Sequence, residues 1–191
     1  YSANSAVEYV KKSANKFTED ILSANGTNYV AVVSYKATAQ EVIDFTDDND
    51  SLKDSINALS ASSTTRDISA GLKMANEMIS GIDDDKAIKN VVLVTTGMTN
   101  NGQYNYSGHY DESTIGSIWR RTDNQVRLYA YANVAYAEAQ KVKEKANLYT
   151  LGIFQTMSNM PQEGKEIAEF FKLTALDLAS SKEFFYDIED P

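Results

Sequence analysis

The stretch NVVLVTTGMTNNG, residues 90–102, decides the fold of this chain. Its first half is a short aliphatic run, Val91 to Val94, which predicts a strand buried on both faces, as in a parallel sheet covered by helices. The run stops at Thr96-Gly97 and opens into a polar loop. Ligands of open α/β sheets bind beyond the carboxyl ends of the strands. We therefore expect a binding site at this loop, although it carries threonines and no carboxylate, histidine or cysteine.

Helical and strand patterns alternate on both sides of this stretch. Apolar residues at three- and four-residue spacing predict helices over about 5–23, 50–59, 68–79, 124–146 and 167–178. Apolar, β-branched runs predict strands at 28–35, 41–45, 90–95, 148–154 and 184–188. This alternation predicts an α/β fold, a three-layer, doubly wound (Rossmann-like) and mostly parallel sheet with one antiparallel edge strand at 41–45. We expect a single domain over 1–191, with an irregular insertion at 97–123.

Composition excludes several classes of function. The 191 residues carry a net charge of −9, which argues against nucleic acid and anionic membrane surfaces as partners. No apolar run approaches the ~20 residues of a membrane span, so membrane insertion is not expected. The absence of cysteine excludes disulfides, thiolate zinc sites and cysteine nucleophiles, and the single histidine, His109, excludes a multi-histidine metal site.

Several segments, in their order and spacing, resemble a von Willebrand factor type A (vWA) domain. They are NYVAVVSYKATAQEVIDFTDDNDSLKDSINAL (28–59), DISAGLKMANEMI (67–79), NVVLVTTG (90–97), NLYTLGIF (147–154) and FFYDIEDP (184–191). Within that family, the chain is most similar to domains of surface proteins from Gram-positive bacteria. The resemblance implies a divalent-cation site at the carboxyl ends of the strands, built from Asp-x-Ser-x-Ser in a first loop, Thr in a second and Asp in a third. A hard Mg²⁺ ion takes such oxygen ligands.

The chain departs from this family pattern in all three loops. Thr96 stands where the third-loop Asp is expected. Thr65 or Thr64 corresponds to the second-loop Thr, and strict alignment places Arg66 there, where its charge would repel a metal. Thr65 and Thr96 are therefore doubtful metal ligands, and the site is degenerate or incomplete. We expect Mg²⁺ (or Mn²⁺ or Ca²⁺) to bind only if an Asp-x-Ser-x-Ser segment lies upstream of Tyr1.

The resemblance also implies a first, central strand that is missing from these 191 residues. The segment YSANSAVEYVKKSANKF (1–17) is typical of the end of the first loop running into a helix. Without that strand, the strands at 28–35 and 90–95 would each leave a ladder unpaired, at ~1–3 kcal/mol per unsatisfied buried group. We hypothesise that a separate piece of the polypeptide or a partner chain supplies the strand.

The insertion at 97–123 holds a group of aromatic residues. Tyr104, Tyr106, Tyr110 and Trp119 are of the types enriched at protein–protein contacts, but the segment can equally fold back as a lid and bury its rings. Both interpretations stay open. His109 lies near Asp111 and Glu112, yet no identifiable nucleophile accompanies it, so catalysis is disfavoured.

Two acidic segments favour structural roles. Asp67 is expected at a helix N-terminus, where the helix dipole stabilises its charge, more than in a metal site. Residues 83–85 are all aspartate, but they lack the glycine and the distant glutamate of a calcium loop, which favours a solvated turn.

These observations favour a non-enzymatic adhesion module of a larger surface protein, extracellular or cell-wall associated. It would contact a protein or extracellular-matrix ligand through the loops at 60–67 and 96–123, with the candidate contacts Thr64, Thr65, Arg66, Thr96, Tyr104, Tyr106, Tyr110 and Trp119. One alternative is a structural subunit of a surface fibre, completed by a strand from another chain. A nucleotide-dependent Rossmann-like enzyme is disfavoured, because neither glycine-rich phosphate loop is present.

Overall fold

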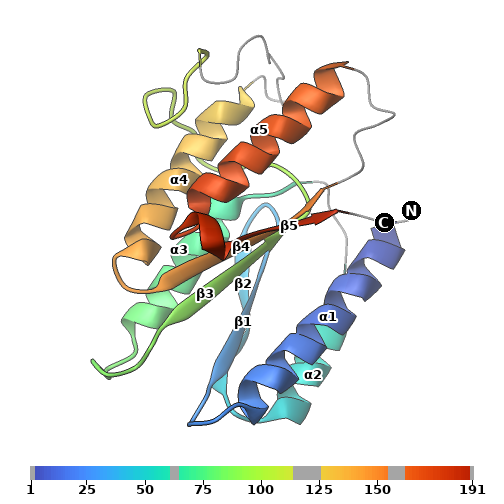
Figure 1. Ribbon diagram of the computed structural model, residues 1–191, viewed down its shortest axis with the longest axis vertical. Helices are drawn as coiled ribbons and strands as arrows, with labels where there is room; N and C mark the ends of the chain where they lie inside the picture. The colour runs from blue at the N-terminus through green and yellow to red at the C-terminus, as the bar shows by residue number, and fades with distance from the viewer. Residues whose placement is uncertain (1–2, 61–64, 114–125, 155–161, 190–191) are drawn as a thin grey trace. The chain divides into compact units, whose positions relative to one another are not determined.

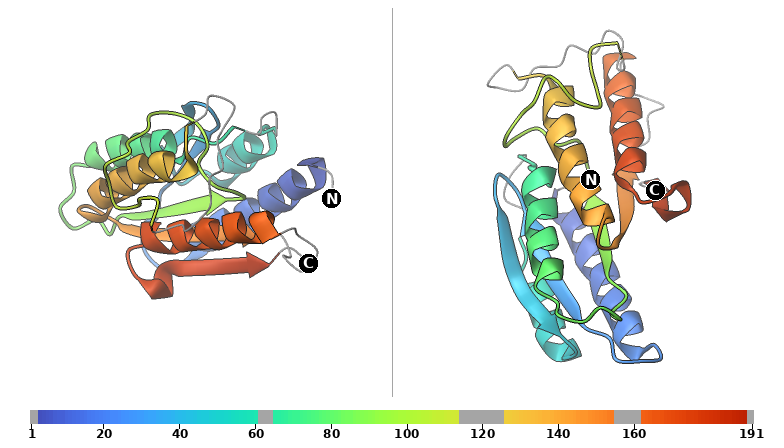
Figure 2. Two further views of the ribbon diagram at one scale, coloured as in Figure 1. Left: turned by 90° about the horizontal axis from the view of Figure 1, so that it is seen from above. Right: turned by 90° about the vertical axis from the view of Figure 1, so that its left-hand side faces the viewer.

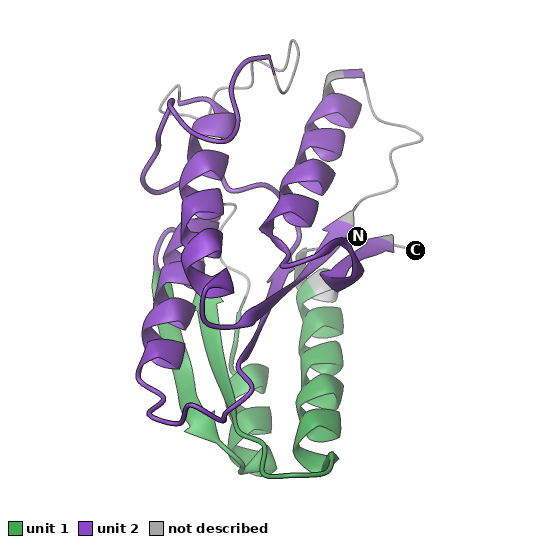
Figure 3. Ribbon diagram, turned by 60° about the vertical axis from the view of Figure 1, so that its left-hand side comes forward, with its two compact units in different colours: residues 1–34, 39–64 green, residues 35–38, 65–191 purple. Residues whose placement is uncertain are grey.

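The computed structural model describes residues 3–60, 65–113, 126–154 and 162–189, which fold into helices and strands in the alternating order that the sequence predicts (Figure 1). The chain divides into two compact units, shown in Figure 3. Unit 1 holds residues 1–34 and 39–64, and unit 2 holds residues 35–38 and 65–191.

Unit 1 consists of two helices and a small two-stranded sheet. It contains α1 (Ala3–Ser23), β1 (Val30–Tyr35, whose last residue belongs to unit 2), β2 (Ala39–Thr46) and α2 (Asn49–Asn57). The two strands pair with each other, and the three residues between them allow only an antiparallel hairpin, since parallel strands need a long crossover. Leu52 and Ile56 of α2 are fully buried and form the centre of this unit.

An acidic residue caps the start of the second helix. Asp48 is the N-cap of α2, and its Oδ1 accepts hydrogen bonds from the backbone N–H groups of Asp50 at 3.0 Å and Ser51 at 3.2 Å. The hydrogen bond from the Ser51 hydroxyl, together with these backbone bonds, holds the pKa of the Asp48 carboxyl below its usual value. The chain therefore turns from β2 into α2 through satisfied polar groups.

Unit 2 contains a parallel three-stranded sheet in the order β3-β4-β5. Its elements are α3 (Ile68–Ser80), β3 (Asn90–Thr95), α4 (Leu128–Lys143), β4 (Asn147–Phe154), α5 (Gln162–Leu178), a 3₁₀ helix (Lys182–Phe184) and β5 (Phe185–Glu189). Leu93 of β3 faces Thr150 of β4, which faces Phe185 of β5. Helical crossovers between neighbouring parallel strands confirm the predicted α/β fold with a mostly parallel sheet.

The core of unit 2 lies on one face of this sheet. The helices α3, α4 and α5 lie in a row along it (Figure 2). Leu93 and Leu148 point into their cluster and pack with Leu72 of α3, Val142 of α4 and Leu178 of α5. The buried Thr150 hydroxyl donates to the Ala175 carbonyl of α5 at 2.7 Å, which ties the middle strand to its helix.

The prediction that residues 90–95 are buried on both faces is wrong. Leu93 and Thr95 are buried, whereas Val92 and Val94, which alternate with them, are each 36% exposed. Side chains of a strand point alternately to opposite faces, and the three helices of unit 2 cover one face only. The outer face carries half-buried or exposed apolar side chains, which are Val92, Val94, Tyr149, Leu151, Ile153, Tyr186 and Ile188.

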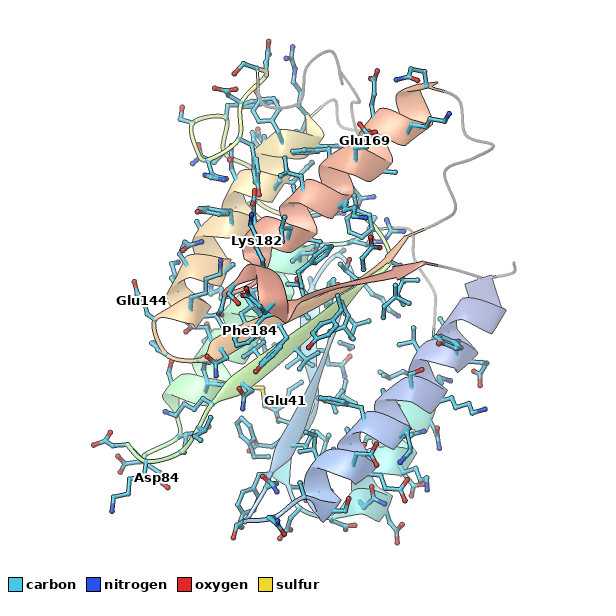
Figure 4. All side chains as sticks on the ribbon, viewed as in Figure 1. Glu41, Asp84, Glu144, Glu169, Lys182 and Phe184 are labelled. Atoms are coloured by element: carbon cyan, nitrogen blue, oxygen red, sulfur yellow. The ribbon has the colours of Figure 1, made fainter. Side chains whose placement is uncertain are left out.

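Two aromatic rings stack on the outer face of the sheet. Phe184, labelled in Figure 4, stacks on Tyr149 of β4 with ring centroids 4.2 Å apart. In the described part of the chain, β3 pairs with β4 and with no strand along its other edge, and β1 pairs only with β2. Two separate sheets with open edges are what a missing central strand would leave.

The packing predicts unequal costs for two leucine truncations. Leu148→Ala should lower the free energy of unfolding by about 3 kcal/mol, because it empties a fully buried site between sheet and helices. Leu173→Ala, on the exposed side of α5, should change it by less than about 0.5 kcal/mol. Urea denaturation followed by circular dichroism measures both, and equal costs would contradict the one-sided core.

Candidate functional site

The second and third loops meet at the carboxyl end of β3. The backbone N–H of Arg66 donates to Asn100 Oδ1 at 2.7 Å, and the N–H of Asn100 donates to the Arg66 carbonyl at 2.9 Å. The Thr99 hydroxyl donates to the same carbonyl at 3.1 Å. Residues more than 30 positions apart in sequence are thereby joined, so the backbone of Arg66 is held in place from both sides.

The guanidinium of Arg66 lies against the backbone of Gly97. A Cβ atom added at Gly97 would stand 2.8 Å from Arg66 Cζ, 3.0 Å from Nη1 and 3.1 Å from Nε. Such nearly equal distances mean that Gly97 faces the flat side of the guanidinium plane. A larger residue at position 97 would displace the guanidinium from this place.

Tyr35 also contacts the carboxyl end of β3. Its hydroxyl donates to the Val94 carbonyl of β3 at 2.8 Å, and the Thr95 hydroxyl donates to the Gly97 carbonyl at 2.8 Å. Burial raises the pKa of the Tyr35 phenol, while the Thr95 side chain and the positive charge of Arg66 oppose that rise. Arg66 is therefore electrostatically coupled to the end of β3.

Asp67 caps a helix, as the sequence predicts. Its Oδ1 accepts from the Ala70 N–H at 3.0 Å and from the Ser69 hydroxyl at 2.5 Å, and its side chain is buried at the start of α3. Gly102, at a φ of +98°, passes so close that a Cβ atom there would overlap the Asp67 carboxylate. The Asp67 carboxylate thus caps the N-terminus of α3 and lies directly against the loop at Gly102.

The described residues do not fit the divalent cation that the resemblance implies. Among them, no group of three or more histidine, aspartate or glutamate side chains converges. Thr65 is half-buried and Thr96 is exposed; both are neutral, and Thr64 lies outside the described residues. A dication near Thr96 would meet the Arg66 guanidinium instead of a third-loop carboxylate, and like charges repel.

The loop that follows is held by one side chain of α4. Asn133, buried in the helix, accepts from the Tyr110 N–H at 2.7 Å and donates to the carbonyls of Tyr110 and Asn105, both at 2.9 Å. The Asn105 N–H in turn donates to the Ala130 carbonyl at 2.9 Å. Residues 105–110 are therefore anchored along α4 by four hydrogen bonds.

A polar cluster fastens the same loop to α5. Tyr110 is 1% exposed, and its hydroxyl donates to Asp177 Oδ2 at 2.9 Å. His109 stacks on Tyr136 of α4 with centroids 4.0 Å apart, and its Nε2 lies 3.5 Å from the same Asp177 oxygen. Lys143 of α4 donates to the Asp177 carbonyl at 2.8 Å. Burial and the nearby Asp177 charge raise the pKa of the Tyr110 phenol, and burial lowers that of Lys143 against the attraction of Asp177.

Two tyrosines of the loop face outward. Tyr104 and Tyr106 are 53% and 46% exposed and meet edge to face, with centroids 5.7 Å apart. Each also meets a buried ring of α4 edge to face, Tyr104 on Tyr131 and Tyr106 on Tyr129. We call Tyr104 and Tyr106 the tyrosine platform. The loop thus combines the two interpretations that the sequence left open, since Tyr110 is buried and the platform is exposed.

The structure adds partners that the sequence did not indicate. Asn133 and Asp177 organise the loop, and an asparagine inside an alanine- and tyrosine-rich helix was the one visible signal. Asp177, not Asp111 or Glu112, is the carboxylate beside His109, and Glu112 forms an ion pair with Arg127. Trp119 lies outside the described residues.

The acidic run at residues 83–85 forms an exposed turn between α3 and β3, as the sequence favours. Figure 4 shows Asp84 at the tip of that turn. Its Oδ1 accepts from the backbone N–H of Lys86 at 2.9 Å, a local turn bond.

Comparison with known sequences and structures identifies similar proteins. The sequence model of the von Willebrand factor type A domain matches residues 2–99. The vWF domain of the type V pili tip protein Mfa5 from Porphyromonas gingivalis is similar, with a TM-score of 0.71 and 17% identity over 96% of this chain and 82% of that chain. Comparison with curated protein sequences gave no match.

Two further solved structures share the fold. The pilus adhesin SpaC from Lactobacillus rhamnosus GG gives a TM-score of 0.70 and 14% identity, over 98% of this chain and 26% of that chain. Proximal thread matrix protein 1 from the mussel byssus, with a zinc-occupied MIDAS motif, gives 0.64 and 15%, over 96% and 39%. This chain thus spans a minor part of both proteins, and identities this low show a common fold alone.

The Tyr110 contacts predict a pH-dependent contribution to stability. Tyr110→Phe should cost about 1.5–3 kcal/mol at pH 7, because a buried hydrogen bond to a carboxylate is lost. The raised pKa keeps folded Tyr110 protonated above pH 10, where the unfolded phenol ionises, so this contribution declines as pH rises past 10. Urea denaturation between pH 7 and 11 should show a smaller alkaline loss for Tyr110→Phe than for the unmodified chain. Tyr104→Phe, at an exposed ring, is the control, and an unchanged slope in Tyr110→Phe would contradict the assignment.

Proposed function

The chain belongs to the von Willebrand factor type A domain family, and we propose that it is a non-enzymatic, protein-binding adhesion module of a larger surface protein. The tyrosine platform is the observation that carries this proposal, because its two rings are exposed and pack edge to face on buried rings of α4. The similar folds of pilus tip, pilus adhesin and thread matrix proteins support the same class of function and an extracellular or cell-wall location. No helix within the described ranges has both the length and the apolar character to span a bilayer.

The composition of the platform loop suits protein recognition. Residues 101–110, NGQYNYSGHY, are rich in tyrosine, asparagine, serine and glycine, the residue types that antibody loops use for contact. Tyrosine supplies a large contact area at a low entropic cost, and the Asn133 hydrogen bonds order the loop before any ligand arrives. A loop that is already ordered loses less conformational entropy when it binds.

The proposed contact surface has two parts in unit 2. The platform is one, and the loops that carry Thr65, Arg66 and Thr96 are the other. Tyr110 is buried and anchors the loop to Asp177, while Thr64 and Trp119 stay proposed contacts outside the described residues. Because the described residues do not fit a dication, binding by this chain should persist in EDTA.

The polar cluster around Asp177 supports a structural rather than catalytic role for His109. Asp177 Oδ2 already accepts from the Tyr110 hydroxyl, and the imidazole is stacked on Tyr136. A general base needs a nucleophile or substrate proton within reach. The hydroxyl closest to this pair in the described cluster, that of Tyr110, has a pKa raised well above its usual value and is a poor nucleophile.

A second candidate function is a structural subunit of a surface fibre. The outer face of the β3-β4-β5 sheet is apolar, and β3 has an edge without a strand among the described residues. An extended apolar segment from another chain could pair with that edge and cover Val92 and Val94, as in strand addition.

The first candidate predicts that binding depends on the platform. Tyr104→Ala/Tyr106→Ala should weaken binding to surface-immobilised extracellular-matrix proteins by roughly tenfold or more, measured by surface plasmon resonance, because exposed tyrosines act as contact anchors. The matched control is Tyr9→Ala/Tyr29→Ala, which removes two equally exposed tyrosines of unit 1 and should leave affinity unchanged. Equal losses in both variants, or complete loss in EDTA, would refute the proposal.

The second candidate predicts self-association through β3. Size-exclusion chromatography with light scattering should show oligomers of the unmodified chain, and Val92→Lys/Val94→Lys should shift them to monomer, because edge lysines block strand pairing. Lys substitutions at Tyr9 and Tyr29 are the control for added charge. A monomeric unmodified chain at high concentration would argue against the fibre subunit and leave the adhesion module standing.

A further inference from the structure

The chain contains two Asn-Gly pairs, Asn25-Gly26 and Asn101-Gly102, which differ in one contact. Both glycines have a left-handed backbone, with a φ of +101° at Gly26 and +98° at Gly102. The side chain of Asn101 is folded back on the backbone, so that its Oδ1 accepts a hydrogen bond from the Gly102 N–H at 2.6 Å. No corresponding bond joins the exposed Asn25 to Gly26 in the described part of the chain. The two pairs thus share a sequence and differ in side-chain geometry.

An asparagine side chain is open to attack by the backbone nitrogen of the residue that follows it. The nitrogen gives up its proton to a base in water and forms a bond to Cγ. The Cγ–Nδ2 bond then breaks, Nδ2 takes up a proton, and ammonia leaves behind a five-membered succinimide ring. Water opens this ring at either carbonyl and produces aspartate or isoaspartate. The net reaction consumes one water and releases one ammonia, which is one reason that asparagine is thermolabile.

The hydrogen bond at Asn101 brings the reacting atoms together before any reaction. The Gly102 nitrogen lies 2.6 Å from Oδ1, and the carbonyl bond adds ~1.2 Å, so the nitrogen is at most about 3.8 Å from Cγ. Reactive arrangements hold the two atoms about 3–3.5 Å apart. Loss of the shared proton leaves the electron pair of the nitrogen directed at the carboxamide. Glycine adds no side chain that would obstruct ring closure.

The surroundings of this pair make its conversion consequential. Asn101 and Gly102 are half-buried, and Gly102 lies so close to the buried Asp67 carboxylate that a Cβ atom would not fit. A carboxylate at position 101 would add a second negative charge near Asp67, and like charges repel. Isoaspartate would also lengthen the main chain by one methylene and shift Gly102. The hydrogen bonds between Arg66 and Asn100 lie directly beside this change.

We propose that Asn101 is a self-modification site: in the folded protein the Gly102 nitrogen attacks Asn101 Cγ, and the aspartate or isoaspartate that results loosens the contact between the loop at 97–102 and residues 66–67. The reaction needs no enzyme, metal or ligand, only water. The inference goes beyond the proposed function and does not depend on it. Its consequence falls on the two loops that we propose as part of the contact surface, so the modification would alter that surface as the protein ages.

The test compares the two Asn-Gly pairs within one unmodified chain. The 191-residue chain is incubated at pH 8, and peptide mass spectrometry follows the conversion of amide to acid at Asn101 and Asn25. In the folded chain Asn101 should convert roughly tenfold faster than Asn25, because its side chain is already in place. In urea the ratio should fall to about one, since both pairs have the same local sequence. Equal or slower conversion of Asn101 in the folded chain, or a tenfold excess that persists in urea, would overturn the proposal.

Hydrogen exchange tests the loosened loop separately. The backbone N–H groups of Arg66 and Asn100 should exchange several-fold faster in Asn101→Asp than in the unmodified chain, because their hydrogen bonds open more often. The matched control is Asn25→Asp, which adds the same charge in unit 1 and should leave both exchange rates unchanged. If Asn101→Asp does not fold, the deamidated fraction of the unmodified chain, separated by anion exchange, gives the same measurement. Unchanged exchange at Arg66 and Asn100 would overturn the proposed loosening.

Discussion

The one-sided burial of β3 is the constraint on which the rest of unit 2 depends. Leu93 packs against α3, α4 and α5, and this contact holds one face of the strand against the three helices. The same arrangement leaves Val92 and Val94 on an open face. Apolar burial stabilises by about 25 cal/mol per Å², so covering this second face would add substantially to stability. Both the site and the open face therefore follow from the packing of helices on one face of β3.

At the carboxyl end of β3, hydrogen bonds from polar side chains hold two loops together that are distant in sequence. In a complete divalent-cation site, the metal would join such loops. Asn100 and Thr99 bind the backbone of Arg66, and Asn133 binds the backbone around Tyr110. These are buried or half-buried bonds to main-chain groups, which would be costly to leave unsatisfied. Loops ordered in this way suit recognition, because little entropy remains to be lost on binding.

The order and kind of elements were readable in the sequence. The strand at 90–95 has the predicted bounds, because an aliphatic run between Asn90 and Thr96-Gly97 has clear limits. Asp67 was recognisable as a helix start, since a carboxylate ahead of an apolar helical pattern has a local reason to be there. The vWA resemblance named the fold and pointed to Thr96 and Arg66 as departures from a metal site.

Tertiary structure alone decided which groups meet. Sequence spacing gave no reason to pair His109 and Tyr110 with Asp177, 67 positions beyond Tyr110, in preference to Asp111 and Glu112 close by. It also could not show that Tyr110 is buried while Tyr104 and Tyr106 are exposed, because all three lie in one aperiodic segment. Local pattern determines helices and strands through periodicity and capping. The contacts of a loop depend on the packing of distant helices, and that is fixed only when the chain has folded.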